Sequence, residues 1–305
     1  MSHSDHYYGT NAELYEARRK DKPMWGLEQS VVERWVSHGP VLDVPCGTGR
    51  YFDIYKDKGL DFIGMDISTD MLNMTRERFP DAKLDLGSVH NMPYADKQFG
   101  TVVCTRLVHW FDLEQTRSAM KEMFRVGEHV LVTLGLGEEK RVTTTYDHSE
   151  DNWKRVIEGY YPQRELLQVN EGRNVWYAYY LRKPTMDDVR DQFQDREETC
   201  IQDLIDVWCR LFRLGDGERY GVDLSQMKRL DFVYRTNDQL MDMMIKMAEH
   251  QPKMWWDKEA RDFDRPLTLV RYKGHEFMID GRRRCNVWAK SPGLYPAFLI
   301  DFDNG

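Results

Sequence analysis

Long apolar runs are missing from this sequence. No stretch of its 305 residues approaches the ~20 consecutive apolar residues that a membrane span needs. The opening segment, MSHSDHYYGTNAELYEARRKDK, also lacks the apolar core of a secretory signal peptide. We therefore expect a cytoplasmic protein that does not enter a membrane.

Cysteine is scarce as well. The five cysteines are odd in number and form no C-x-x-C pair. This spacing argues against a disulfide framework and against a structural metal site, and it fits reduced thiols in a cytosol-like compartment.

A surplus of positive charge is absent too. Lysine and arginine number 43 against 51 aspartates and glutamates, which gives a net charge of −8. The surface as a whole repels polyanions, so any DNA contact must be local, and DNA is not a favoured partner. With 41% hydrophobic residues, a chain of 305 residues is long enough for two domains with cores of their own.

What the first half does contain is a regular alternation of short β-branched runs with helix-like segments. This alternation predicts a parallel sheet with helices on both faces and ligands at the carboxyl ends of its strands. Two helices broken near Lys22–Pro23 precede it. The strands are expected at 40–44, 61–67, 83–88, 99–108, 129–137 and 174–185, and the helices between them at 49–59, 68–80 and 113–127.

The turn after the first strand reads VLDVPCGTGR, with Gly47 and Gly49 where a ligand would approach backbone amides. The spacing matches neither G-x-G-x-x-G nor a P-loop. Asp66 ends the next strand, where a carboxylate can accept from both ribose hydroxyls. Together they predict an adenosine-like ligand, although Asp66 taken alone could instead cap the next helix, which already has Ser68 and Thr69 as caps.

Four segments in order, VLDVPCGTGR, FIGMDISTDML, LGSVHNMPYADKQFGTVVC and LVHWFDLEQTRSAMKEMFRV, resemble the consecutive motifs of class I S-adenosylmethionine-dependent methyltransferases. The resemblance covers about residues 7–184. It implies a Rossmann-like methyltransferase sheet, S-adenosylmethionine as the cofactor, and a domain that spans 1–184. The family's cofactor contacts carry over as a set: Tyr15, Arg18, Asp43, Pro45, Gly47, Gly49, Asp66, Ile67, Ser88, Val89 and Arg106.

Within that set the resemblance implies separate roles. Asp43 and the two glycines would contact the methionine part of the cofactor, and Asp66 the ribose. Ser88 stands where the family often has an acid that reads the adenine amino group, so this sequence departs from the family there. Tyr15 and Arg18 match a helix that covers the cofactor.

The methyl acceptor is expected at the rim after the fourth strand, where Arg106, His109 and Trp110 lie. His109 is the candidate catalytic base, because an imidazole titrates near neutral pH. The alternative is that His109 and Trp110 pack against the following helix.

Between the two halves, residues 185–217 carry apolar side chains at helical spacing, including Ile201, Ile205 and Trp208. We expect this segment to be a helical linker. The second domain would then span 218–305.

The C-terminal part contains LTLVRYKGHEFMID, a hairpin that turns at Lys273–Gly274. DGRRRCNVWAK follows, in which a strand turns into a helix that begins with three arginines, which outlines a phosphate site. These features resemble the ParB/sulfiredoxin-like fold over about residues 220–303, with YPAFLID as the closing strand. The resemblance implies a small α+β domain that binds ATP or CTP, with these site residues: Arg235, Asp280, Gly281, Arg282, Arg283 and Arg284. The alternative is that the three arginines are a solvated helix start.

The leading hypothesis is a methyltransferase that acts on a small molecule, such as a nucleotide, a modified base or another phosphate-bearing compound. A second hypothesis is a kinase or NTPase in the ParB-like half, helped by Glu276 or Asp280, with the first domain sensing S-adenosylmethionine. A non-enzymatic adaptor on DNA is the third hypothesis, and the net charge weighs against it.

Overall fold

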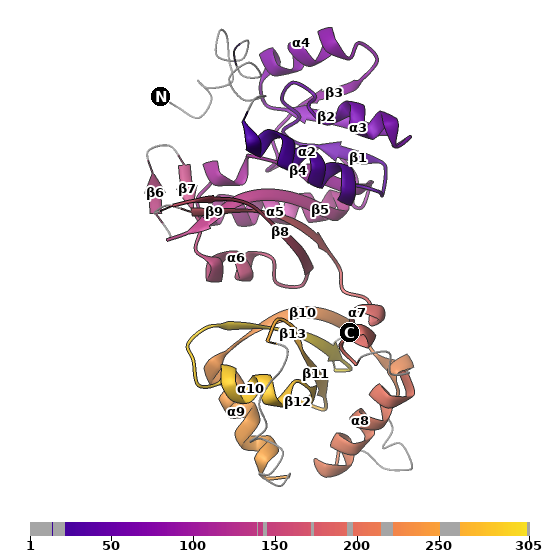
Figure 1. Cartoon of the computed structure of the whole chain (residues 1–305). Coiled ribbons are helices and arrows are strands. Elements are labelled where there is room, and N and C mark those ends of the chain that lie inside the picture. The colour runs from indigo at the N-terminus through magenta and orange to yellow at the C-terminus, as the bar shows by residue number, and fades with distance from the viewer. Residues whose placement is uncertain are drawn as a thin grey trace. The chain divides into compact units, whose positions relative to one another are not determined.

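The computed structural model describes Leu14 and residues 22–138, 140–142, 145–171, 174–193, 198–214, 222–250 and 263–303. These residues fall into two compact units (Figure 1). The first unit lies within Met1–Ile157 and Pro162–Arg182, and the second within Glu158–Tyr161 and Lys183–Gly305. The helix predicted before Lys22 lies outside the described residues.

The first unit is built on a seven-stranded sheet. Five strands are parallel, and the fifth of them pairs antiparallel with β9. The predicted α/β sheet is therefore confirmed. In spatial order the strands are β3 (Lys83–Leu86), β2 (Phe62–Asp66), β1 (Val41–Asp43), β4 (Phe99–Cys104), β5 (Gly127–Gly137), β9 (Asn174–Arg182) and β8 (Tyr161–Asn170).

The helices of this unit begin where their sequences provide a start signal. Pro23 occupies the first turn of α2, Ser68 accepts a hydrogen bond from the Met71 amide at the start of α4, and Asp112 forms a capping box with Gln115 at the start of α5. The bounds are α2 (Pro23–Trp35), α3 (Phe52–Asp57), α4 (Thr69–Arg78), η2 (Val108–Trp110), α5 (Leu113–Val126) and α6 (Glu150–Val156).

The core of the first unit explains why the strands read as continuous apolar runs. Val41, Val103 and Leu131 pack with residues of α2, α3 and α4 in one buried cluster. Neighbouring residues along a strand point to the opposite face, and α5 contacts β4 and β5. Both faces of the sheet are thus covered, as a parallel sheet requires.

Three strands and one helix of this unit were not anticipated from the sequence. They are β8, α6 and the small pair β6 (Lys140–Val142) and β7 (Thr145–Asp147). β8 reads YPQRELLQVN, in which charged and apolar residues mix without a clean alternation. β8 lies at the edge of the sheet beside β9, and Leu167 is its one buried residue, which fits the mixed pattern.

The second unit has a four-stranded sheet of its own. The predicted hairpin is confirmed: Lys273 and Gly274 both have positive φ, 51° and 74°, as a two-residue hairpin turn requires. The Asp303 carboxylate accepts hydrogen bonds from the amides of both turn residues. In spatial order the strands are β10 (Arg229–Thr236), β13 (Leu294–Asp301), β11 (Leu267–Tyr272) and β12 (His275–Asp280).

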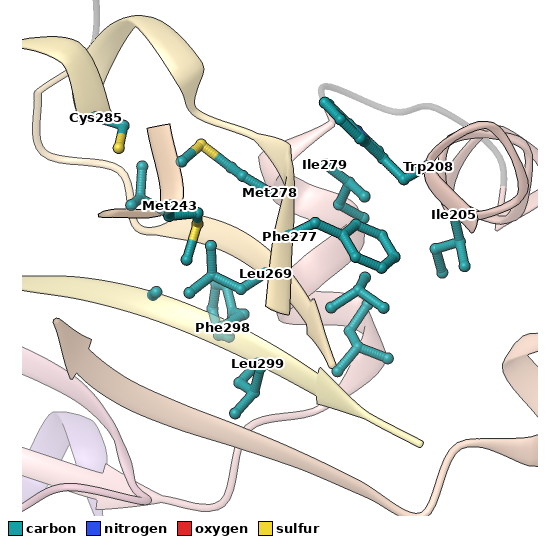
Figure 2. Packing of buried hydrophobic residues seen from close by; sticks show 14 of the residues in the cluster. Ile205, Trp208, Met243, Leu269, Phe277, Met278, Ile279, Cys285, Phe298 and Leu299 are labelled. Atoms are coloured by element: carbon teal, nitrogen blue, oxygen red, sulfur yellow. The ribbon is translucent and has the colours of Figure 1, made fainter. Parts of the chain in front are cut away.

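The described residues of the segment 185–217, which we expected to be a linker, instead belong to this second unit. Ile205 and Trp208 lie in one buried cluster on the same side of the sheet as Phe277 and Ile279 of β12 (Figure 2). The apolar stripe read from the sequence is real, and it covers the sheet rather than bridging domains. The helices of the unit are α7 (Met186–Gln192), α8 (Glu198–Leu211), η3 (Leu224–Gln226), α9 (Asn237–Ala248) and α10 (Arg282–Trp288).

The helices that the structure describes include none that is long and apolar enough to cross a membrane.

Candidate functional site

A pocket, with about 620 Å³ of empty space when the adjoining open solvent is included, lies in the first unit at the carboxyl ends of β1, β2 and β4. The strand order reverses between β1 and β4, and such a switch point leaves a crevice for ligands in an open α/β sheet. The described residues that line it are Trp25, Pro45, Cys46, Gly47, Thr48, Arg50, Tyr51, Asp66, Ile67, Met71, Thr105, Arg106 and Leu107.

The glycine turn forms one wall of this pocket. Gly47 has φ +55°, and a Cβ atom there would find open space, so the backbone conformation is what favours glycine. Gly49 has φ +72°, and its Cβ would lie 3.0 Å from Phe79 and Thr75. Gly47 therefore faces the ligand space, whereas Gly49 lets the turn pack against α4. Of these predicted cofactor contacts, Gly49 is not among the lining residues.

Asp66 both lines the pocket and fastens the turn. Its carboxylate accepts hydrogen bonds of 2.9 Å from the amides of Gly47 and Ser68. Burial raises the pKa of Asp66, while these backbone hydrogen bonds oppose the shift. The cap of α4 is Ser68 rather than Asp66. Each carboxylate oxygen of Asp66, a residue of the pocket lining, has the capacity to accept more than one hydrogen bond.

Asp43 lies beneath the turn and does not line the pocket as the described residues define it. Its side chain is fully buried. Burial raises the pKa of Asp43 to about 8, against the opposing effects of the Arg50 charge and the Tyr55 hydroxyl group. Asp43 is therefore mostly protonated at pH 7.

A buried ionic cluster forms another wall of the pocket. The Glu28 side chain is fully buried, and its Oε2 lies 3.0 Å from Arg50 Nη1 and 3.3 Å from Arg106 Nη1. The Thr133 hydroxyl donates to Glu28 Oε1 over 3.0 Å. The Arg50 guanidinium lies 4.4 Å from the ring centre of Trp25 and 4.3 Å from that of Tyr51. The fold therefore brings the positive charges of Arg50 and Arg106 and the negative charge of Glu28 together beside the pocket.

The sequence reading missed Glu28 and did not single out Arg50. Arg50 stands inside the quoted turn, so its position was a usable signal. Glu28 carried none, because it is one of several charged residues in a helix, and only the packing of α2 over the sheet shows that it is buried.

His109, the candidate base, lies in η2, next to the residues that line the pocket. Its ring is 5.2 Å from that of Trp176 in an edge-on arrangement and 5.3 Å from that of Trp110. Arg106, which lines the pocket, lies 5.8 Å from the same Trp176 ring. The acceptor rim predicted after β4 thus brings Arg106 and His109 to one tryptophan of β9.

The other predicted cofactor contacts are distributed differently. Pro45, Ile67 and Arg106 line the pocket, whereas Ser88 and Val89 are not among its described lining residues. Ser88 instead accepts a hydrogen bond from the His90 amide in the turn after β3. Tyr15 and Arg18 lie outside the described residues.

The arginine turn of the second unit is closed by its own ion pair. Gly281 has φ +99°, and the Arg284 side chain, which is buried, donates to Asp280 and to the Arg265 carbonyl. Arg283 is exposed, and burial lowers the pKa of Arg282. Of the three arginines that the sequence offered as a phosphate site, Arg284 therefore holds the turn itself.

The remaining candidates of this unit belong to a second ionic network. Arg235 makes a paired contact with Glu276 at 2.9 and 3.0 Å. Arg271 lies 3.0 Å from both Glu276 and Asp301. Glu276 and Asp280, the two candidate catalytic helpers of this unit, thus both form ion pairs with arginines.

Comparison with known proteins bears on the first unit. Residues 41–129 match a family model described as a methyltransferase domain. An uncharacterized methyltransferase-like protein of Schizosaccharomyces pombe is 29% identical over 122 residues, which covers 39% of this chain and 46% of that protein. The demethylmenaquinone methyltransferase of Renibacterium salmoninarum is 35% identical over 86 residues, covering 28% of this chain and 35% of the relative. The chain therefore spans less than half the length of these relatives.

Among solved structures, the magnesium protoporphyrin IX methyltransferase of Synechocystis with bound S-adenosylmethionine has a TM-score of 0.48 and 13% identity to this chain. That likeness covers 59% of this chain and 94% of the Synechocystis protein.

Proposed function

We propose that this chain transfers a methyl group from S-adenosylmethionine to a small-molecule acceptor, because its residues 41–129 match a methyltransferase domain and a pocket opens at the switch point of the same sheet. The observation that carries the proposal is the hydrogen bond between Gly47 and Asp66. The Gly47 amide donates to the Asp66 carboxylate over 2.9 Å, and both residues line the pocket.

The residues present fit this cofactor. The backbone of Pro45 and Gly47 would face its methionine part, and Asp66 would accept from its ribose hydroxyls. S-adenosylmethionine would supply an activated methyl group on a sulfonium. The chain then has to align the acceptor atom and, where that atom carries a proton, take the proton away. His109, beside Trp176, is the residue proposed for the second task.

A calorimetric titration tests the proposal. We expect S-adenosylmethionine and S-adenosylhomocysteine to bind the wild type, and Asp66→Ala to weaken both by more than about tenfold, or ~1.4 kcal/mol. The control is Asp53→Ala, since that side chain is 63% exposed and lies away from the pocket lining. Equal affinity in the Asp66 variant and the wild type would contradict the assigned site.

The acceptor class is a further part of the proposal. A nucleotide, a modified base or another phosphate-bearing compound is the class that the sequence favours.

For the second unit, ATP or CTP binding at a ParB-like turn is a separate proposal, supported by the exposed Arg283 beside Gly281. It predicts that Arg283→Ala weakens the binding of ATP or CTP, whereas Arg229→Ala, at an exposed site in the same unit, does not. Titration with both nucleotides decides the matter, and absence of binding to the wild type would reject the proposal.

A further inference from the structure

We propose that the first unit takes an acceptor that carries an anionic group, a carboxylate or a phosphate, and that Arg106 binds this group next to His109. The inference rests on the proposed function and deepens it, because it assigns the acceptor's recognition to the methyltransferase domain itself.

The charges around Glu28 are not balanced. Two guanidinium groups meet one carboxylate oxygen at 3.0 and 3.3 Å, and the Glu28, Arg50 and Arg106 side chains are only 0, 7 and 20% exposed. Within the described part of the chain, these contacts leave one positive charge over in a setting with little water. A buried charge without a counterion is costly, so the cluster favours an anion at its accessible side. Arg106 is the more exposed of the two arginines.

Among the residues that the structure describes, the neighbouring acids Asp43 and Asp66 do not supply that anion. Asp43 lies close enough to Arg50 for their charges to interact, but its carboxyl group is mostly protonated at pH 7 because burial raises its pKa to about 8. Asp66 accepts hydrogen bonds from the backbone of Gly47 and Ser68.

Arg106 is held in place as a binding residue would be. Its φ of +58° is unusual for a residue with a side chain, and such conformations persist where the surroundings enforce them. The Arg106 amide donates to the Thr133 hydroxyl over 3.1 Å, and that hydroxyl donates to Glu28. Arg106 Nε is buried and has no acceptor among the residues that the structure describes, so it is not the donor that a ligand would meet. The Arg106 side chain is 20% exposed and lines the pocket, and the terminal nitrogens of its guanidinium are the donors that would reach a carboxylate or a phosphate.

The position of Arg106 points to the acceptor rather than the cofactor. It follows β4 and lies 5.8 Å from Trp176, whose ring is 5.2 Å from His109. An anion bound by Arg106 would lie near the Trp176 and His109 rings, which are not themselves among the described lining residues. A cofactor with a sulfonium and an ammonium group would add positive charge to the same pocket, and an anionic acceptor would offset it.

The test uses charged and neutral probes of one shape. The full chain, saturated with S-adenosylhomocysteine, is titrated with phenyl phosphate, benzoate and the neutral benzamide. We expect at least one of the two anions to bind at least tenfold more tightly than benzamide in the wild type. Arg106→Gln should remove this preference, and Arg106→Lys should keep part of it, because lysine retains the charge but not the fork. Arg78→Gln, at a 41% exposed arginine outside the pocket lining, is the matched control and should behave as the wild type.

A second pair of ligands shows whether Arg106 binds the cofactor or the acceptor. 5′-Methylthioadenosine lacks the amino-acid part of S-adenosylhomocysteine, including its carboxylate. If Arg106→Gln weakens S-adenosylhomocysteine by tenfold or more but leaves 5′-methylthioadenosine unchanged, Arg106 binds the cofactor's carboxylate and the inference is wrong. Equal binding of the anions and benzamide to the wild type would also overturn it, while the proposed function would stand. If S-adenosylhomocysteine itself does not bind the wild type, the proposed function fails first.

Discussion

At the scale of single residues, a carboxyl group that is mostly neutral at pH 7 lies beneath the glycine turn. Asp43 is surrounded by Tyr55, Cys46 and the Arg50 charge, and burial raises its pKa to about 8 from an ordinary value of 3.8. The folded state therefore holds a proton that the unfolded chain releases at much lower pH.

This proton makes the stability of the first unit depend on pH. Because the pKa is raised on folding, the stabilising contribution is complete below about pH 4 and is lost as the pH rises toward about 8. We expect Asp43→Asn to flatten the dependence of the unfolding free energy on pH between 5 and 8. Urea unfolding at several pH values measures this, with Asp53→Asn as the exposed control. A slope unchanged by Asp43→Asn would show that this carboxyl group is already ionised in the folded state.

At the scale of elements, α8 decides where the second unit begins. Its residues Ile205, Trp208 and Cys209 are buried against the four-stranded sheet, whereas Val207 on the same helix is 36% exposed. A linker helix would contribute nothing to the core of the four-stranded sheet, whereas α8 supplies part of that core.

Shortening a buried side chain of α8 should therefore destabilise β11 and β12, which are far from α8 in the sequence. Replacing the 1% exposed Trp208 by alanine leaves a large cavity, a change that typically costs about 3–5 kcal/mol. We expect amide hydrogen exchange in β11 and β12 to accelerate strongly in Trp208→Ala and little in Val207→Ala. If β11 and β12 exchange as in the wild type, α8 does not support the sheet.

At the scale of the whole molecule, two units each have a buried core. Chains of this kind do not unfold in a single all-or-none step. A ligand that binds only the folded form of one unit raises that unit's transition temperature.

We accordingly expect two heat-absorption transitions, one of which rises on addition of S-adenosylhomocysteine. Differential scanning calorimetry with and without the ligand measures both. The transition that rises should be lost or shifted by Asp43→Asn and left in place by Trp208→Ala, which alters the other unit. If S-adenosylhomocysteine raises only the transition that Trp208→Ala alters, the cofactor site lies in the second unit and the proposed site is wrong.

Much of the fold follows from local patterns in the sequence. The glycines of VLDVPCGTGR, the strand and helix alternation up to β5, and the Lys273–Gly274 hairpin depend on neighbouring residues, whose backbone preferences and apolar spacing are visible in the sequence. The proximity of Gly47 and Asp66 also follows from the sequence, because two consecutive parallel strands end at the same edge of the sheet.

The tertiary structure alone decided the rest. Glu28, Arg50, Arg106 and Thr133 come from four separate segments, and no local pattern announces that they meet. Their contact depends on how α2 packs against the sheet, where its residues share a buried cluster with Val41, Val103 and Leu131, and this packing is set by the burial of apolar surface across the whole unit. The same reason explains why the sequence showed the stripe of α8 but not the sheet that it covers.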